Sequence, residues 1–187
     1  MQPEETALTI AVYGGSAVRE GGADYALAYQ LGRLLAEAGL TVLSGGYIGC
    51  MEAVSRGACD AGGEAIGLTV PLFEKRGISP NSWLSRRIPC QDLFDRLARF
   101  TTLARGFVAL PGGVGTLGEV AVTRNLLQVG AIRRRPLVLI GGGWSRVFQA
   151  MAANLYIGPG DVGLVRLVET AEEAIEILQR HLNEGSE

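Results

Sequence analysis

A glycine-rich segment at residues 111–120, with the sequence PGGVGTLGEV, contains residue types that can bind a phosphate group. It follows an apolar run at residues 107–110 and precedes a segment with helical periodicity, so it lies where a strand would lead into a helix. Glycines and a threonine at such a junction leave backbone N–H groups unobstructed at the positive end of the helix, which favours phosphate binding. The alternative is a tight turn whose glycines only permit positive φ, but such a turn needs neither the threonine nor so many glycines. The predicted phosphate-binding residues are Gly112, Gly113, Val114, Gly115 and Thr116.

A carboxylate lies close to this predicted phosphate site. Glu119 follows Thr116 by three residues, which is about one turn of a helix with ~3.6 residues per turn. A phosphate-binding loop with an adjacent acid indicates a ligand site more strongly than a glycine-rich turn alone.

An arginine that could reach the same site lies in a predicted helix at residues 92–104. At ~100° per residue, Arg96 falls at the edge of the buried face of this helix, whereas Arg99 falls further out. We therefore predict that Arg96 enters a cleft and that Arg99 forms an ordinary i,i+4 ion pair with Asp95. The predicted buried face consists of Leu93, Leu97, Phe100 and Ala104.

The composition excludes two classes of phosphate-binding enzyme. Lys75 is the only lysine, because the other sixteen of the 17 basic residues are arginines. A pyridoxal-phosphate enzyme needs a lysine for its Schiff base, and a P-loop NTPase needs one inside its glycine loop. Lys75 lies in a polar loop at residues 73–82 and meets neither requirement.

The sequence also lacks the residues that a metal site or a histidine-based catalytic site needs. His181 is the only histidine, and the three cysteines have no zinc-type spacing, so we expect neither a metal site nor a histidine-based triad. Cys50 lies beside a glycine motif and could touch a ligand, but a small buried apolar role is more typical. The other cysteines are Cys59 and Cys90.

Length and composition favour one globular domain over residues 1–187, with 48% hydrophobic and 19% charged residues. No apolar run reaches the ~18–20 residues of a membrane span, and the N-terminus does not resemble a signal peptide, so we expect a cytoplasmic protein without a membrane partner. The net charge is −2 and the arginines are scattered, so no nucleic-acid partner is expected. The densest cluster, at residues 133–135, is interpreted as a solvated loop.

Strand patterns alternate with helical patterns along the whole chain, which predicts βαβ units and a parallel sheet. We expect a single Rossmann-like, doubly wound α/β domain whose mainly parallel sheet has about seven strands. The predicted strands cover residues 8–13, 40–44, 64–69, 83–88, 107–110, 136–140 and 164–168.

Three glycine-rich turns follow the first, second and fifth predicted strands. In a doubly wound sheet the carboxyl ends of the strands form the ligand-binding edge, so these turns should meet there. No G-x-G-x-x-G fingerprint follows the first strand and no acid ends the second, so a mononucleotide fits better than NAD. Besides the loop at residues 111–116, the turns contribute the predicted substrate-binding residues Gly14, Gly15, Ser16, Gly45, Gly46 and Gly49.

The predicted helix that follows the phosphate-binding loop has two apolar faces. Leu117, Val120, Ala121 and Leu127 share one face, and Val122, Leu126 and Val129 share the other. A helix with two apolar faces is buried on both sides. The sheet can cover one face, and the simplest cover for the second is another subunit, so we predict a homodimer or a larger homo-oligomer.

The sequence from about residue 8 to residue 140 resembles the Lonely Guy (LOG) family of cytokinin-activating phosphoribohydrolases, whose relatives are often labelled lysine decarboxylases. The P-G-G-x-G-T-x-x-E motif of that family is matched in full at residues 111–119, and its G-G-G-x-x-G-L-M motif corresponds to SGGYIGCM at residues 44–51. The arginine of the family lies fifteen residues before the motif proline, and that position here is Arg96. The chain departs from the family at Phe94 and Leu97, which replace its histidine and lysine, and at Gly118, which replaces a glutamate found in many members.

The resemblance implies hydrolysis of the N-glycosidic bond of a nucleoside 5′-monophosphate, such as an AMP-like compound, to a free base and ribose 5-phosphate. It implies catalytic roles for Arg96 and Glu119 and no cofactor or metal, and it leaves the base open. It also implies a dimer or a larger assembly, because relatives are oligomeric. The alternative is a non-catalytic nucleotide-binding or molybdenum-cofactor carrier protein of the same superfamily, which would use the same phosphate-binding loop.

Overall fold

The computed structural model describes residues 8–156 and 163–184 of the chain. Its centre is one seven-stranded sheet in the order β4-β3-β2-β1-β5-β6-β7, and every neighbouring pair of strands is parallel. The expectation of a doubly wound parallel sheet is therefore confirmed. The strands are β1 Thr9–Tyr13, β2 Thr41–Ser44, β3 Ala65–Thr69, β4 Arg86–Pro89, β5 Gly106–Ala109, β6 Leu137–Ile140 and β7 Arg166–Val168.

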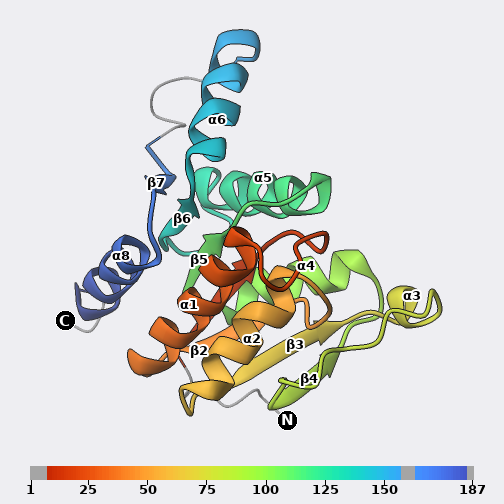
Figure 1. Cartoon of the computed structure of the whole chain (residues 1–187). Helices are drawn as coiled ribbons and strands as arrows, with labels where there is room; N and C mark the ends of the chain where they lie inside the picture. Colours follow the sequence, from red (N-terminus) through yellow and green to blue (C-terminus); the bar gives the residue numbers. More distant parts are fainter. Residues whose placement is uncertain (1–7, 157–162, 185–187) are drawn as a thin grey trace.

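Helices cover both faces of this sheet (Figure 1). Alternate residues of a strand point to opposite faces, and β1 shows how this builds two cores. Ile10 and Val12 belong to the core under α1, α2 and α8, whereas Ala11 and Tyr13 belong to the core under α4, α5 and α6. The helices are α1 Ala23–Glu37, α2 Cys50–Asp60, α3 Pro71–Glu74, α4 Leu93–Leu103, α5 Val114–Gln128, α6 Gly142–Asn154 and α8 Ala171–Glu184.

The seven predicted strands are all present, and their starts agree with the prediction to within three residues. The largest shift is at β4, because Trp83 lies in a turn and the strand begins only at Arg86. The order of strands reverses between β1 and β5, which lie side by side although three strands separate them in sequence. The carboxyl ends of β1 and β5 therefore form the topological switch point at which such sheets bind ligands.

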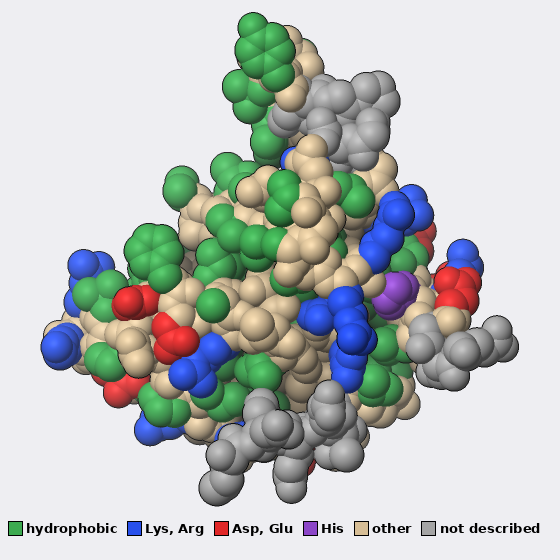
Figure 2. Space-filling view, turned by 180° about the vertical axis from the view of Figure 1, so that it is seen from behind, with side chains coloured by type: hydrophobic (Ala, Val, Ile, Leu, Met, Phe, Trp, Pro, Cys, Tyr) green, Lys and Arg blue, Asp and Glu red, His purple; other side chains and the backbone are tan. Residues whose placement is uncertain are grey.

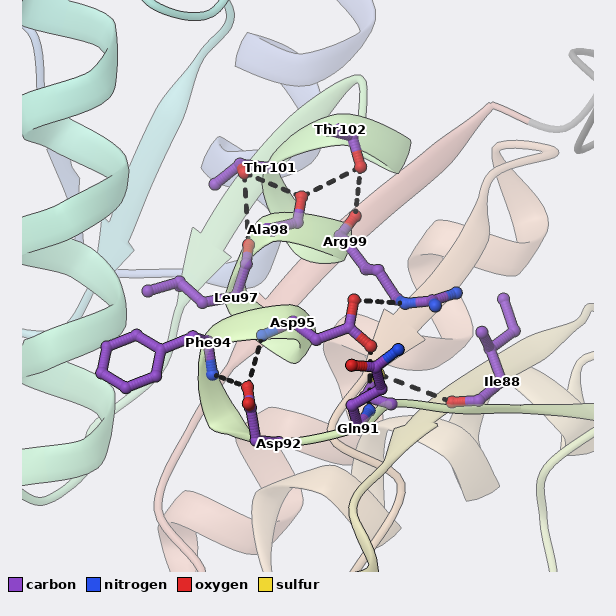
Figure 3. A network of polar contacts seen from close by, with 11 residues as sticks. Ile88, Gln91, Asp92, Phe94, Asp95, Leu97, Ala98, Arg99, Thr101 and Thr102 are labelled. Carbon is purple, nitrogen blue, oxygen red and sulfur yellow. Dashed lines mark hydrogen bonds and ion pairs between the residues drawn. The ribbon is translucent and has the colours of Figure 1, made fainter.

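The predicted buried face of α4 is only half right. Phe100 and Ala104 are buried, but Leu93 is 44% exposed and Leu97 is only partly buried. The reason is that the second half of this helix packs on the sheet, whereas its first turn is exposed and begins at a polar N-cap residue. In that cap Asp92 accepts hydrogen bonds from two backbone N–H groups of the first turn (Figure 3).

The first of the two apolar faces predicted for α5 is only partly buried. Val120 and Leu127 are buried as expected, but Leu117 is 37% exposed and Ala121 is exposed as well. Thr116 and Thr123 take the remaining buried positions. A threonine can face the sheet here because the Thr123 hydroxyl forms a 3.0 Å hydrogen bond with the Tyr13 hydroxyl of β1.

Candidate active site

A pocket of about 340 Å³ lies at the switch point between β1 and β5. The loops after β1, β2 and β5 contribute to it, together with two side chains from α4, Arg96 and Phe100, and several from the start of α5. The structure thus brings together most of the sequence-predicted site residues. Those that line the pocket are Gly14, Gly15, Ser16, Gly45, Arg96, Gly113, Val114, Gly115, Thr116 and Glu119.

The loop after β5 presents the N-terminus of α5 to this pocket. Gly113 is the residue that precedes the first turn of the helix, and no side chain caps that turn. The first N–H groups of a helix have no partner inside it, so the backbone N–H groups of residues 114–116 are available to an anion. Val114 is 86% exposed, which leaves this end of the helix open to a ligand.

Three of the predicted binding glycines do not line the pocket but allow its loops to approach one another. A Cβ atom on Gly112 would lie 2.2 Å from Oγ1 of Thr116, and one on Gly46 would lie 2.9 Å from the Cα atom of Gly67. Gly49 has a φ of +71°, and a Cβ atom there would lie 2.4 Å from the carbonyl oxygen of Gly15. Gly49 therefore lets the loop after β2 approach the loop after β1, while Gly46 lets it pack against β3 and Gly112 makes room for Thr116 of α5.

The two predicted catalytic side chains meet inside the pocket. Nη2 of Arg96 lies 3.2 Å from Oε1 of Glu119 and donates a hydrogen bond to it. Both side chains are largely buried, with 13% of Arg96 and 18% of Glu119 exposed. Arg99, in contrast, is 39% exposed and donates from Nε to Oδ1 of Asp95 at 2.9 Å, as predicted (Figure 3).

Burial changes the acidity of Glu119. It raises the pKa of this carboxyl from its ordinary value of 4.5 to about 7, and the neighbouring Arg96 guanidinium opposes part of that rise. A carboxyl with a pKa near neutrality can exchange a proton at physiological pH, which is the property required of a general acid or base.

Aromatic side chains that were not among the predicted site residues hold Arg96 in place. Its guanidinium carbon lies 5.4 Å from the ring centre of Phe73 and 6.0 Å from that of Phe100. Gly45 leaves space for it, since a Cβ atom there would lie 3.1 Å from Nη1 of Arg96. Tyr47 packs edge-on against Phe73, so aromatic rings form this wall of the pocket.

Phe73 lies in α3, whose single turn has no buried residue, and it could not be found from hydrophobic periodicity. The available signal was its position in the loop after β3, because that loop leaves the carboxyl edge of the sheet.

Tyr13 forms the floor beneath the ion pair of Arg96 and Glu119. It is 1% exposed, stacks on Phe107 and contacts Phe100 edge-on. Burial raises the pKa of its hydroxyl well above the usual range. Tyr13 therefore acts as a neutral, fixed support for the site.

Cys50 is buried at the first turn of α2, as expected of a small apolar residue. Burial raises the pKa of its thiol to about 11, which disfavours the reactive thiolate. Among the described residues, no group of three or more His, Cys, Asp and Glu side chains could hold a metal ion. No helix in the described part of the chain is long and apolar enough to cross a membrane.

Comparison with known proteins gives a family and several relatives. The family model described as "Possible lysine decarboxylase" matches residues 51–178. A cytokinin riboside 5′-monophosphate phosphoribohydrolase of Rhodococcoides fascians is 29% identical over 140 residues, which are 74% of this chain and 70% of that protein. The rice enzyme of the same name, LOG, is 33% identical over 132 residues, which are 70% of this chain but only 54% of the rice protein.

The fold is also that of a solved structure with another role. The molybdenum cofactor binding protein of Rippkaea orientalis superposes with a TM-score of 0.75 at 25% sequence identity. The match covers 95% of this chain and 99% of that one.

Proposed function

This chain belongs to the possible lysine decarboxylase family, which includes the LOG phosphoribohydrolases, and on that premise we propose that it hydrolyses the N-glycosidic bond of a nucleoside 5′-monophosphate. One observation carries the proposal: the hydrogen-bonded pair of Arg96 and Glu119 lies in a pocket that also receives the N-terminus of α5. A phosphate at that N-terminus would bring the sugar close to the carboxylate.

In the proposed reaction, water adds to C1′ of the ribose and the base leaves with a proton, which yields a free base and ribose 5-phosphate. The backbone N–H groups at residues 113–116 and the Thr116 hydroxyl bind the 5′-phosphate. Breaking the glycosidic bond develops positive charge on the ribose, as in other glycoside hydrolyses. The Glu119 carboxylate stabilises that charge or activates the attacking water.

Arg96 fixes the orientation of the Glu119 carboxylate and assists departure of the base. The base would occupy the part of the pocket lined by Tyr47, Phe73 and Phe100, where aromatic rings offer it an apolar surface. No step in this scheme needs a metal or an organic cofactor.

The test is a substrate panel. Purified protein is incubated separately with AMP, CMP, GMP, UMP and isopentenyl-AMP, and ribose 5-phosphate is assayed in each reaction. Release of ribose 5-phosphate from at least one of them supports the proposal and identifies the base.

A second function is favoured by the similarity to the Rippkaea orientalis protein. In that reading the chain is a non-catalytic carrier that binds a nucleotide or a molybdenum cofactor through the N-terminus of α5. A carrier has no use for a buried carboxylate opposite an arginine, which is why we favour the hydrolase. Tight ligand binding without turnover in the substrate panel would favour the carrier.

We also propose that the protein is a homodimer or a larger homo-oligomer. Val122 on α5 is 38% exposed, and Val129, which directly follows this helix, is 66% exposed. On α6, which projects from the body of the molecule in Figure 1, Val147 is 37% exposed, and Leu155 directly follows the helix with 58% exposed. Hydrophobic side chains gather at this projecting end (Figure 2). An uncovered apolar surface of this kind marks an interface, and a second copy of the chain would cover it.

A further inference from the structure

A second pocket, of about 480 Å³, lies at the opposite edge of the sheet from the candidate active site. It is formed at the amino ends of β6 and β7, by the second half of α8 and by the end of α5. Nothing in the proposed reaction uses it, and the inference drawn from it does not rest on that reaction.

The walls of this pocket are strongly basic. Guanidinium groups come from three segments that are distant in sequence: Arg134 and Arg135 from the loop before β6, Arg166 from β7 and Arg180 from α8. His181 lies beside them, and Figure 2 shows blue arginine side chains around the single purple histidine. Glu184 is the only carboxylate that the described residues contribute to the lining.

Within residues 8–156 and 163–184, no ion pair links Arg134, Arg166 or Arg180 to an acidic side chain. Five ion pairs occupy arginines elsewhere in the described part of the chain, and none of them includes Arg134, Arg166 or Arg180. The pocket therefore concentrates positive charge in a protein whose net charge is −2.

Arg135 fixes the loop before β6 at the edge of this pocket. Its Nη1 atom donates hydrogen bonds to the carbonyl oxygens of Thr101 and Ala104 at the end of α4. Burial and the positive charges of Arg105 and Arg133 lower the pKa of its guanidinium. The expectation that residues 133–135 form a solvated loop is thus wrong for Arg135, which anchors the loop and lines the pocket together with Arg134.

We propose that this pocket binds a small organic anion that carries two or more phosphate groups. The guanidinium groups of Arg134, Arg166 and Arg180 match the charge and the forked hydrogen bonding of phosphates. The floor contains Leu127, Leu137 and Ile177, which provide an apolar surface for the rest of the ligand. Because Leu127 is in α5, the same helix reaches from this pocket to the phosphate-binding loop of the candidate active site.

Inorganic pyrophosphate and tripolyphosphate are the probes, and isothermal titration calorimetry is the measurement. The double variant R166A/R180A should bind tripolyphosphate at least about 10-fold more weakly than the wild type, because two charge-assisted contacts are lost. The matched control is Arg87→Ala, which removes an exposed arginine from β4, the strand at the other edge of the sheet, and should leave the affinity unchanged. If the double variant unfolds, the single variants R166A and R180A are measured instead.

A further variant, Thr116→Val, removes the hydroxyl that the proposed reaction places on the 5′-phosphate, and it lies outside this second pocket. The affinity for tripolyphosphate should survive it. Equal affinity in the wild type and R166A/R180A would overturn the proposal. So would binding that only Thr116→Val weakens, no binding to the wild type, or tighter binding of duplex DNA than of tripolyphosphate.

Discussion

Nη2 of Arg96 lies 3.2 Å from Oε1 of Glu119, although the two residues are 23 positions apart and belong to different helices. α4 and α5 are on the same face of the sheet, and the strand β5 between them in sequence fixes their relative position. The contact therefore depends on the sheet, and it places a positive charge beside a buried carboxylate. The predictions below test what that pair does.

The first prediction contrasts two arginines of α4. Arg96→Ala removes the partner of Glu119 and should lower kcat/KM about 10²–10³-fold, the effect of losing one electrostatic stabiliser in an active site. Arg99→Ala removes only an exposed ion pair with Asp95 and should change kcat/KM by less than about twofold. Equal losses in the two variants would mean that the ion pair with Glu119 has no catalytic role.

The second prediction concerns pH. The proposed reaction needs the ionised form of Glu119, whose pKa is raised to about 7 by burial. The value of kcat/KM should therefore be constant above pH 7 and fall about tenfold per pH unit below it. Since the Arg96 guanidinium lowers the pKa of Glu119, Arg96→Ala should move this break to higher pH. A profile that rises toward acid pH would instead assign Glu119 the role of an acid.

The third prediction concerns the stability of the folded protein, which ionisation of the buried Glu119 carboxyl should lower. Because the pKa of Glu119 is higher in the folded state than its ordinary value of 4.5, the free energy of unfolding should fall as pH rises from about 4.5 to 7. Glu119→Gln cannot ionise, so its Tm should exceed that of the wild type by a few degrees at pH 8 and by little at pH 4.5. Differential scanning fluorimetry across this range measures the difference, and Glu176→Gln, at an exposed position of α8, is the control. Parallel curves for Glu119→Gln and the wild type would show that Glu119 is not perturbed.

The fourth prediction concerns assembly. Val122→Glu places a charge on the uncovered face of α5 and should convert a dimer to a monomer at micromolar concentration. Leu8→Glu changes a residue that is 45% exposed and precedes β1, outside the predicted interface helix, and should leave the mass unchanged. Light scattering reports both masses. A wild-type mass near that of one 19.7 kDa chain would rule out the dimer.

The sequence was sufficient to predict the sheet because its strands are short apolar runs between strong glycine signals. It also predicted the meeting of Arg96 and Glu119, since the motif spacing and the helical phase of Arg96 both pointed to the edge of the sheet. What could not be predicted were contacts that depend on tertiary packing. Thr123 faces the sheet only because the Tyr13 hydroxyl of β1 is there to bond with it, and a hydrophobic pattern assigns that position to solvent.

The basic pocket shows the same limit of prediction from sequence. Residues 133–135 read as a solvated loop because neighbouring charges in a sequence are usually exposed. The pocket that includes Arg134 also needs Arg166 and Arg180, which lie more than thirty positions further along the chain. No local pattern relates such distant charges, and only the fold brings them together.

The central claim is that this site hydrolyses nucleoside 5′-monophosphates through Glu119. The most direct test compares the wild type with Glu119→Gln on AMP and on the best substrate of the panel, with the free base and ribose 5-phosphate measured together. We predict release of the two products in equal amounts by the wild type, and a loss of turnover of about 10²–10⁴-fold in the variant with ligand binding retained. No release of free base from any nucleotide by the wild type, or equal turnover by wild type and variant, would contradict the account.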